Sequence, residues 1–308
     1  MKIFMAGATG VIGRRAVPLL IAGGHSVTGI GRSANKCAGL EQAGAGSVDV
    51  DVFDADALAT AIAGHDVVVN LATHIPSGLR IFLPWAWREN DRLRRVASAN
   101  LAGAAMAGGA QRFIQESFAP TYPDSGDRWI DEQVILAPTS YNRTVLDAER
   151  AAADFTARGG TGVVLRFAAF YGPDAEQSAT MIQAVRRGWA PLPGAAENYL
   201  SSVTHDDAAS AVAAALTAPA GAYNVTDDVP LSRHDFFEAI AAAIDVAPPR
   251  PLPRWVTPLF GSLGEILSRS LRISNGKLRT ATGWTPASPS AREGWAATVA
   301  AMHHGGAM

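Results

Sequence analysis

A glycine-spaced segment near the start of the chain, AGATGVIG at residues 6–13, constrains the fold more than any other feature. It places Gly7, Gly10 and Gly13 three residues apart, directly after the apolar run KIFMA (2–6) and before a helical pattern. Glycine permits a tight turn, close packing of the helix on the strand, and close approach of an anion to the helix N-terminus. The segment therefore predicts the first strand–turn–helix unit of an α/β sheet.

The same segment predicts a binding loop for the pyrophosphate of a dinucleotide, because the N-terminus of the following helix offers free N–H groups and a positive dipole end. A structural turn without a ligand is the alternative. The residues expected to hold the cofactor here are Gly7, Thr9, Gly10, Val11, Ile12 and Gly13.

Beyond the loop, the N-terminal half alternates apolar β-like runs with helical patterns. Strands are expected at 25–32, 45–52, 66–73, 112–117 and 163–172, and helices at 11–24, from about 54, and at 88–109. The run DVVVN is typical of a strand that is buried on both faces. This alternation predicts an α/β fold, a Rossmann-type doubly wound parallel sheet over residues 1–172.

The pattern loosens after residue 172. Helices are expected at 178–188, 205–216 and 232–244, a short strand at 222–226, and a proline-rich link at 247–258. We expect residues 173–308 to form mainly a smaller C-terminal substrate-binding lobe, with parts of 200–228 returning to the sheet.

Composition narrows the classes of function. Hydrophobic residues make up 48% of the 308 residues and charged residues 18%, which is enough apolar material for a full core. The net charge of −2 without a Lys/Arg block argues against nucleic acid as a partner. The single cysteine, Cys37, excludes an intramolecular disulfide and a cysteine-cluster metal site, and we expect no metal.

The N-terminal apolar run is glycine-interrupted without a clear cleavage site, and no uncharged segment has the length of a membrane span. We therefore expect a cytoplasmic protein that has no membrane partner.

The end of the second expected strand indicates which dinucleotide binds. The segment GRSANK (31–36) carries Arg32 and Ser33 and has no acid. A carboxylate there would bind the ribose hydroxyls of NAD, whereas an arginine can fork onto the 2′-phosphate of NADP. The sequence therefore favours NADPH over NAD, and a solvated basic strand end is the alternative.

With these motifs in order, the chain resembles the extended short-chain dehydrogenase/reductase family of the NAD-dependent epimerase/dehydratase type. The matching segments are the glycine loop, VDVFD (50–54), VVVNLAT (67–73), LRFAAFYGP (165–173), VTHDDAASAV (203–212) and TGWTPASPSAREGWAATV (282–299). The resemblance implies that Asp51 and Val52 lie beside the adenine, that Leu71 and Ala72 line the cofactor, and that Phe167 lies near the nicotinamide. It also implies a small-molecule substrate, with Tyr171 in its pocket, and a possible homodimer.

The family's catalytic set does not carry over intact. Relatives use a tyrosine, a lysine four residues later, a serine or threonine, and an asparagine. In SYNRTVLDAE (140–149) this chain keeps Tyr141 but has Val145 at the lysine position. Phe118 falls at the hydroxyl position with Ser117 beside it, and Arg94 falls near the asparagine position. The resemblance thus implies an altered substrate pocket at Arg94, Ser117 and Phe118.

Without the lysine, Tyr141 should remain neutral, because a free tyrosine has a pKa near 10. A neutral tyrosine can still donate a proton, so the sequence favours reduction over oxidation. His74, which follows the fourth strand, is a second candidate acid or base, or else a loop histidine that holds backbone. Glu116 is expected in the pocket at the end of the fifth strand, or paired with Arg94 or Arg112.

Three functions follow from these residues. The first is an NADP(H)-dependent oxidoreductase with an atypical site that reduces a carbonyl, enone or related group of a small apolar molecule. The second is a catalytically inactive protein that binds or senses the nicotinamide cofactor. The third is a non-redox isomerase or lyase on the same scaffold. Trp85 and Trp87 would either line the pocket or pack a lid.

Overall fold

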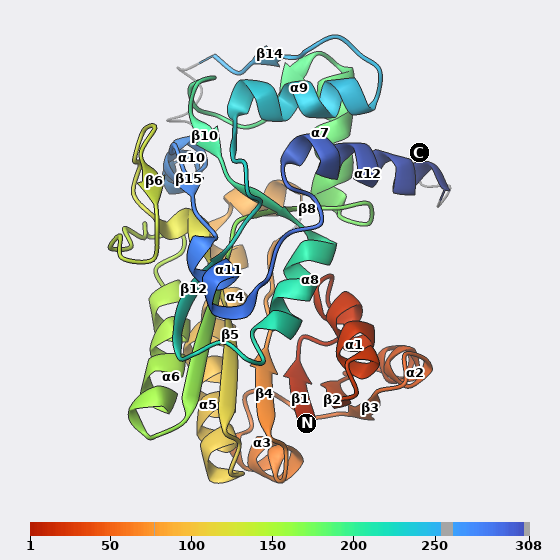
Figure 1. Ribbon diagram of the computed structural model, residues 1–308, viewed down its shortest axis with the longest axis vertical. Helices are drawn as coiled ribbons and strands as arrows, with labels where there is room; N and C mark the ends of the chain where they lie inside the picture. Colours follow the sequence, from red (N-terminus) through yellow and green to blue (C-terminus); the bar gives the residue numbers. More distant parts are fainter. Residues whose placement is uncertain (77, 254–260, 305–308) are drawn as a thin grey trace.

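The computed structural model describes residues 1–76, 78–253 and 261–304. Its centre is a seven-stranded, entirely parallel sheet in the order β12-β7-β5-β4-β1-β2-β3 (Figure 1). The strands are β1 (Lys2–Ala6), β2 (Ser26–Ile30), β3 (Gly46–Val48), β4 (Val67–Asn70), β5 (Arg112–Phe118), β7 (Thr161–Phe167) and β12 (Gly221–Val225). The strand order turns back between β1 and β4, which is the doubly wound arrangement that the sequence predicts.

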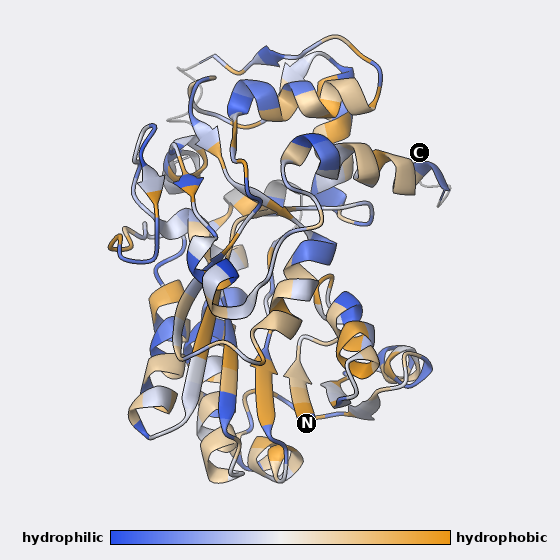
Figure 2. Cartoon of the chain, in the orientation of Figure 1, coloured by the Kyte–Doolittle hydropathy of each residue, from blue (hydrophilic) through white to orange (hydrophobic). Residues whose placement is uncertain are grey.

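Helices cover both faces of this sheet, so the central strands β1 and β4 are buried on both sides. Ile3 and Met5 point into one core with α1 (Gly13–Ala22) and α8 (His205–Ala214). Phe4 and Ala6 alternate into a second core with α3 (Ala55–Ile62), α5 (Ser98–Ala107) and α6 (Val145–Ala157). The hydrophobic colours along most of β1 and β4 in Figure 2 follow from this double burial.

The helix expected at 88–109 is interrupted. It consists of α4 (Arg88–Arg92), a π-helical turn η3 (Leu93–Ala97), and α5. A π turn inserts one extra residue, which changes the directions of the side chains that it carries, and such turns are frequent at functional sites. Arg94 lies in this turn and is buried.

The single strand expected at 163–172 is wrong in its extent. The chain leaves the main sheet at Ala168, whose N–H still bonds to the carbonyl of Val225. From Ala169 on it forms β8 (Ala169–Tyr171), which pairs with β11 (Ser202–Thr204) outside the main sheet. This exit directs the chain from the sheet into the C-terminal lobe.

The C-terminal lobe has its own core beyond the carboxyl ends of the strands (Figure 1). Helices α7 (Glu176–Arg186), α9 (Arg233–Ala243) and α12 (Ala291–His304) enclose buried aromatic side chains there. The remaining elements are α2 (Ala34–Gln42), η1 (Gly78–Phe82), η2 (Pro84–Trp87), η4 (Ala119–Thr121), β6 (Trp129–Ile130), β9 (Trp189–Ala190), β10 (Tyr199–Leu200), β13 (Leu231–Ser232), β14 (Arg250–Pro251), α10 (Gly261–Ser268), β15 (Arg272–Ile273) and α11 (Gly276–Thr282). Part of the expected proline-rich link, residues 254–258, lies outside the described residues.

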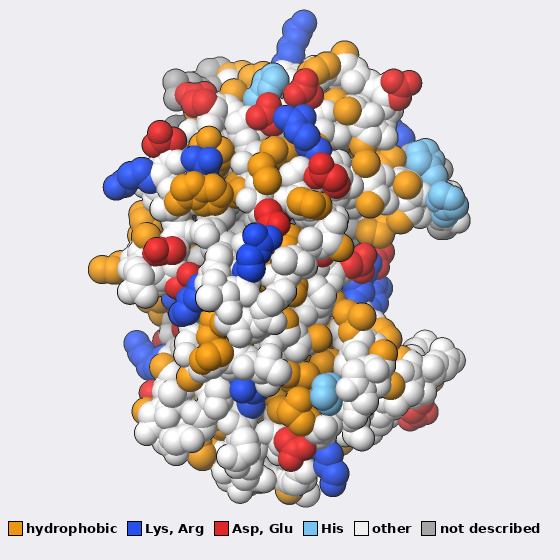
Figure 3. All heavy atoms as spheres, in the orientation of Figure 1, with side chains coloured by type: hydrophobic (Ala, Val, Ile, Leu, Met, Phe, Trp, Pro, Cys, Tyr) orange, Lys and Arg blue, Asp and Glu red, His pale blue; other side chains and the backbone are white. Residues whose placement is uncertain are grey.

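Charges of both signs are interspersed on the face of the molecule that Figure 3 shows, as a net charge of −2 suggests. Within the described ranges, none of the helices combines the length and the apolarity that a bilayer crossing requires.

Candidate cofactor and active site

The glycine loop is shaped by contacts that exclude side chains. Gly7 has a φ of +80°, and a Cβ placed on it would lie 2.5 Å from the carbonyl carbon of Leu71 at the end of β4. A Cβ on Gly13 would lie 2.1 Å from the carbonyl oxygen of Gly7. The loop is closed by a hydrogen bond from the Gly10 N–H to the Gly7 carbonyl at 3.0 Å. Glycine is therefore required at Gly7 for the loop to pack against the chain after β4, and at Gly13 for α1 to pack on the loop itself.

The same loop leaves a helix N-terminus open. No side chain caps α1, whose N-cap residue is Ile12, and its first turn carries no acid. Gly10 and Val11 are exposed, while Thr9 and Ile12 are half-buried. An uncapped helix N-terminus beside exposed glycine backbone fits the pyrophosphate of a dinucleotide.

The residues at the ends of β2 and β3 differ in their surroundings. Arg32 is exposed and forms an ion pair with no acid among the described residues, which leaves its guanidinium available to a phosphate. Ser33 caps α2, since its side chain accepts from the Lys36 N–H at 3.4 Å. Asp51 is exposed and accepts from the Phe53 N–H at 3.0 Å, and Val52 is buried.

Leu71 and Ala72 follow β4 and touch the glycine loop, where the sequence places them in the cofactor crevice. Phe167 and Tyr171, in contrast, are each only 1% exposed. Phe167 packs on Phe170 at 5.3 Å between ring centroids, and Tyr171 stacks on Trp295 at 4.8 Å. Both side chains are thus enclosed in packed cores, and their contact with cofactor or substrate stays a prediction.

Tyr141 lies in a turn directly before α6 and not in the helix itself. Its ring meets the ring of Trp87 edge to face, at 4.4 Å between centroids. Two polar contacts position this turn, from the Thr139 N–H to Asn142 at 3.0 Å and from the Thr144 hydroxyl to Asp91 at 2.8 Å. Val145, in the lysine position, is the first residue of α6 and is fully buried.

Burial sets the protonation state of Tyr141. Loss of water around the hydroxyl raises its pKa above the usual value, and the nearby Arg94 guanidinium opposes that shift only in part. The Tyr141 hydroxyl is therefore protonated at neutral pH and can donate a proton or a hydrogen bond.

Glu116 ends up beside Arg94. The Arg94 Nη2 atom lies 3.8 Å from the Glu116 Oε1 atom. Arg112, the alternative partner that the sequence offers for Glu116, donates instead to the carbonyls of Ala215 and Ala218. Burial raises the pKa of Glu116, Arg94 lowers it, and the charge of Glu149 raises it further. Arg94 and Glu116, both buried, and the half-buried Tyr141 thus form one cluster near the carboxyl end of β5.

Ser117 belongs to a different group. Its hydroxyl donates to Glu149 Oε1 at 2.6 Å, and Glu149 accepts two bonds from Arg166, at 2.8 and 2.7 Å. Arg166 also donates to the Tyr122 hydroxyl at 2.7 Å. This network joins α6 to the sheet, and sequence reasoning missed its core, the Glu149–Arg166 pair. Phe118 is half-buried at the end of β5, directly before η4.

His74 is exposed in the loop after β4, and its backbone N–H donates to the buried Asn90 side chain at 3.0 Å. Its imidazole makes no hydrogen bond with the described residues. Its role as an acid or base stays a prediction.

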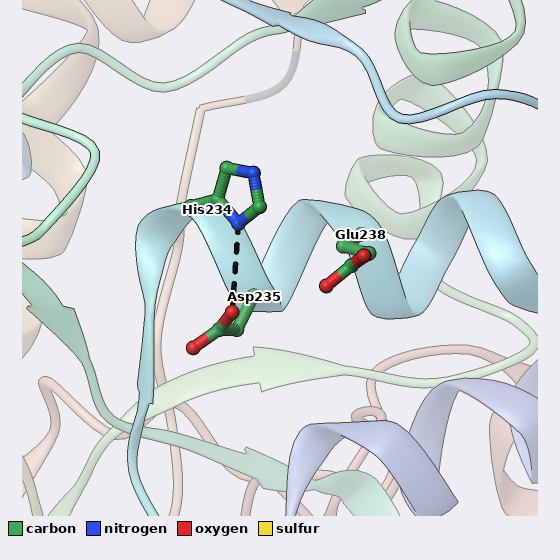
Figure 4. Close-up of side chains that lie close together, drawn as sticks. All are labelled: His234, Asp235 and Glu238. Atoms are coloured by element: carbon green, nitrogen blue, oxygen red, sulfur yellow. Dashed lines mark hydrogen bonds and ion pairs between the residues drawn. The ribbon is translucent and has the colours of Figure 1, made fainter.

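Three side chains on α9, His234, Asp235 and Glu238, lie close enough together to suggest metal ligands (Figure 4). They are at the surface, and both carboxylates also face Arg292, at 3.7 and 4.0 Å. Because this arginine already compensates their charge, we assign no metal site to them.

The parallel sheet, the switch in strand order and the uncapped glycine loop together define a dinucleotide-binding protein of the Rossmann class. A family model described as NAD(P)H-binding matches residues 7–219. The chain is 33% identical to a Streptomyces 3-diazoavenalumate denitrifying reductase over 311 residues, which span 96% of this chain and 99% of the relative. The chain belongs to the family of NAD(P)H-binding proteins that this model describes, which is consistent with the resemblance to the extended short-chain dehydrogenases/reductases.

Solved structures agree with this fold. A human epimerase-family protein solved with NADPH superposes with a TM-score of 0.80 at 22% identity, covering 97% of this chain and 99% of its own. A Thermus thermophilus UDP-glucose 4-epimerase in complex with NAD gives 0.77 at 24% identity, with 98% and 99% covered. At these identities the likeness extends to the fold alone.

Proposed function

We propose that this protein is an NADPH-dependent reductase that transfers a hydride to a small organic acceptor beside Tyr141, Arg94 and Glu116. The main support for this proposal is the position of the glycine loop. The loop contacts the end of β4. The neighbouring strand in the sheet, β5, bears Glu116. A cofactor bound at that loop would bring its reactive end to the region where ligands of open α/β sheets bind. The reductase relative and the NAD(P)H-binding family support an oxidoreductase.

The choice of NADPH rests on Arg32. We expect Arg32→Gln to weaken NADPH binding about tenfold, the loss of one charge-assisted hydrogen bond of ~1.4 kcal/mol, and to leave NADH binding unchanged. Isothermal titration of both cofactors on both proteins measures this, and NADH serves as the internal control. Equal affinities of the unmodified protein for NADPH and NADH would contradict the assignment.

The acceptor determines whether the missing lysine matters. Bound NADPH supplies a hydride. A carbonyl or enone that accepts hydride must also gain a proton, which the protonated Tyr141 hydroxyl of the cluster can donate. A diazonium group needs none, because the carbon–nitrogen bond breaks, N₂ leaves with the bonding pair, and the hydride forms the new C–H bond.

We infer that a diazo compound of the aryldiazonium type is the preferred acceptor class, because a neutral diazoalkane would still need a proton in addition to the hydride. Its reduction with loss of nitrogen, which the name of the Streptomyces relative describes, requires no tyrosine–lysine proton relay. A valine at position 145 would then not impair this reaction. The retained Tyr141 favours a carbonyl or enone as the second candidate.

Tyr141→Phe separates the two acceptor classes. We expect it to slow reduction of an enal such as cinnamaldehyde by about a hundredfold or more, the usual contribution of a general acid, and to change reduction of a phenol diazonium salt less than about threefold. Because burial raises the pKa of Tyr141, enal reduction by the unmodified protein should hold its rate up to about pH 9. Loss of NADPH absorbance measures both reactions.

Tyr223→Phe is the matched control, since that hydroxyl donates to the Pro219 carbonyl outside the cluster. An unchanged rate on the enal in Tyr141→Phe would exclude Tyr141 as proton donor and direct attention to His74. Cofactor binding without turnover of either acceptor would favour a binding or sensing protein instead. Product formed without loss of NADPH absorbance would favour an isomerase or lyase.

A further inference from the structure

We propose that Arg94 is an anion receptor in the active site and that the substrate carries a carboxylate in addition to its reducible group. This inference deepens the proposed function, since it identifies what the same site binds. It is carried by a buried guanidinium that the protein itself leaves largely without partners.

Arg94 is only 5% exposed, yet it makes no hydrogen bond with any described residue. Its Nε atom is buried without an acceptor. Its one ion pair, to Glu116, has a separation of 3.8 Å, which is too long for a hydrogen bond. A buried charge in this condition is unfavourable unless a further group approaches it.

The other buried arginines differ in that each forms hydrogen bonds within the fold, although Arg233 does so through Nη2 alone and its Nε and Nη1 atoms lack partners. Arg166 donates to Glu149 and to the Tyr122 hydroxyl. Arg233 donates to the carbonyls of Leu267 and Arg269. Arg269 donates to Glu265 and to the carbonyls of Tyr122 and Ala137. Arg94 shares their burial without their bonds. A structural role therefore does not account for it.

Arg94 lies in the π turn η3, which carries two neighbouring arginines with different surroundings. In η3 the side chains of Leu93, Arg94 and Ala97 are buried, whereas Arg95 is 59% exposed. The turn thus directs one arginine inward and its neighbour outward.

The cluster around Arg94 suits an anion of a particular shape. Glu116 lies near Nη2 at a distance too long for a hydrogen bond, and the Nε atom on the same edge of the guanidinium lacks a partner. A carboxylate is planar and can accept two parallel bonds from such a guanidinium edge. Trp87 and Tyr141, in contact with each other, add an aromatic wall. These features together fit an aryl or conjugated carboxylate.

Glu116 would compete with that ligand for Arg94. Burial raises the pKa of Glu116, so its negative charge is disfavoured at this position. An incoming carboxylate can therefore replace Glu116 as the partner of Arg94. Removing the Glu116 charge should favour the ligand further.

The test uses cinnamate as the probe and cinnamamide as its uncharged match, each titrated into the NADP⁺-loaded protein by calorimetry. We expect the unmodified protein to bind cinnamate about tenfold more tightly than cinnamamide, or better. Arg94→Met should remove this preference, and Glu116→Gln should strengthen cinnamate binding several-fold. Arg95→Gln, the neighbouring exposed arginine, should leave the preference unchanged.

Equal binding of the two probes, no binding of either, or a preference that survives in Arg94→Met would overturn the proposal. NADPH binding and thermal unfolding report whether Arg94→Met is folded. Should it fail to fold, Glu116→Gln decides, and unchanged or weaker cinnamate binding there would count against the proposal. Because the readout is probe binding, a protein that prefers cinnamate but reduces no acceptor would contradict the proposed function alone.

Discussion

Replacing Gly10 by alanine should reduce NADPH affinity by about a hundredfold, roughly 2.8 kcal/mol, while the protein stays folded. Gly10 is exposed, and the one tight neighbour of an added Cβ is the Gly7 carbonyl oxygen at 3.2 Å. The loop can accommodate that contact with a small shift. The methyl group would, however, stand where the backbone must approach the pyrophosphate. Calorimetry with NADPH and a thermal unfolding curve separate the two effects.

Substitutions of two other glycines serve as comparisons for this prediction. Gly39 lies on the exposed side of α2 with nothing within 4 Å of an added Cβ, so Gly39→Ala should leave NADPH binding intact and raise stability by up to about 1 kcal/mol. Gly13→Ala would force a methyl against backbone and should lower both stability and binding. Normal NADPH binding by Gly10→Ala would mean that the loop does not hold the pyrophosphate.

The sheet was predictable because its signals are local. Alternate residues of β1 enter opposite cores, and the glycine loop follows within one turn of chain. The exit of the chain at Ala168 was not predictable, because it depends on bonds to Val225 and to Ser201, which are distant in sequence. An apolar run such as VVLRFAAFY contains nothing that marks where its partner strand changes.

The candidate site likewise has features that the sequence could predict and features that it could not. The pairing of Glu116 with Arg94 could be predicted, since a strand end and the helix beside it meet at the same edge of the sheet. The π turn could not, because the hydrophobic pattern of the helix continues through it. Ser117 turns toward Glu149 and not toward Tyr141, a choice that depends on Arg166 on the neighbouring strand. Pair interactions across separate elements leave no periodic signal in the sequence.

Arg166→Met should lower the free energy of unfolding by about 3–5 kcal/mol, and Glu149→Gln by a similar amount. The two side chains are only 10% and 14% exposed and form two short bonds, at 2.8 and 2.7 Å. Either substitution leaves the remaining charge buried without its partner. The double variant should recover a substantial part of the loss, because it removes both charges. Denaturant unfolding of the four proteins gives the coupling energy directly.

The surface pair Arg95–Asp147 provides the control, with side chains 59% and 35% exposed and a separation of 3.3 Å. Arg95→Gln should change stability by less than about 1 kcal/mol, since water and salt screen such a pair. If Arg166→Met proved no more harmful than Arg95→Gln, the network would not be what fastens α6 to the sheet. If it is as harmful as expected, the consequence extends to the site. Tyr141 lies in the turn that leads into α6, so loosening α6 should also shift the tyrosine relative to Arg94.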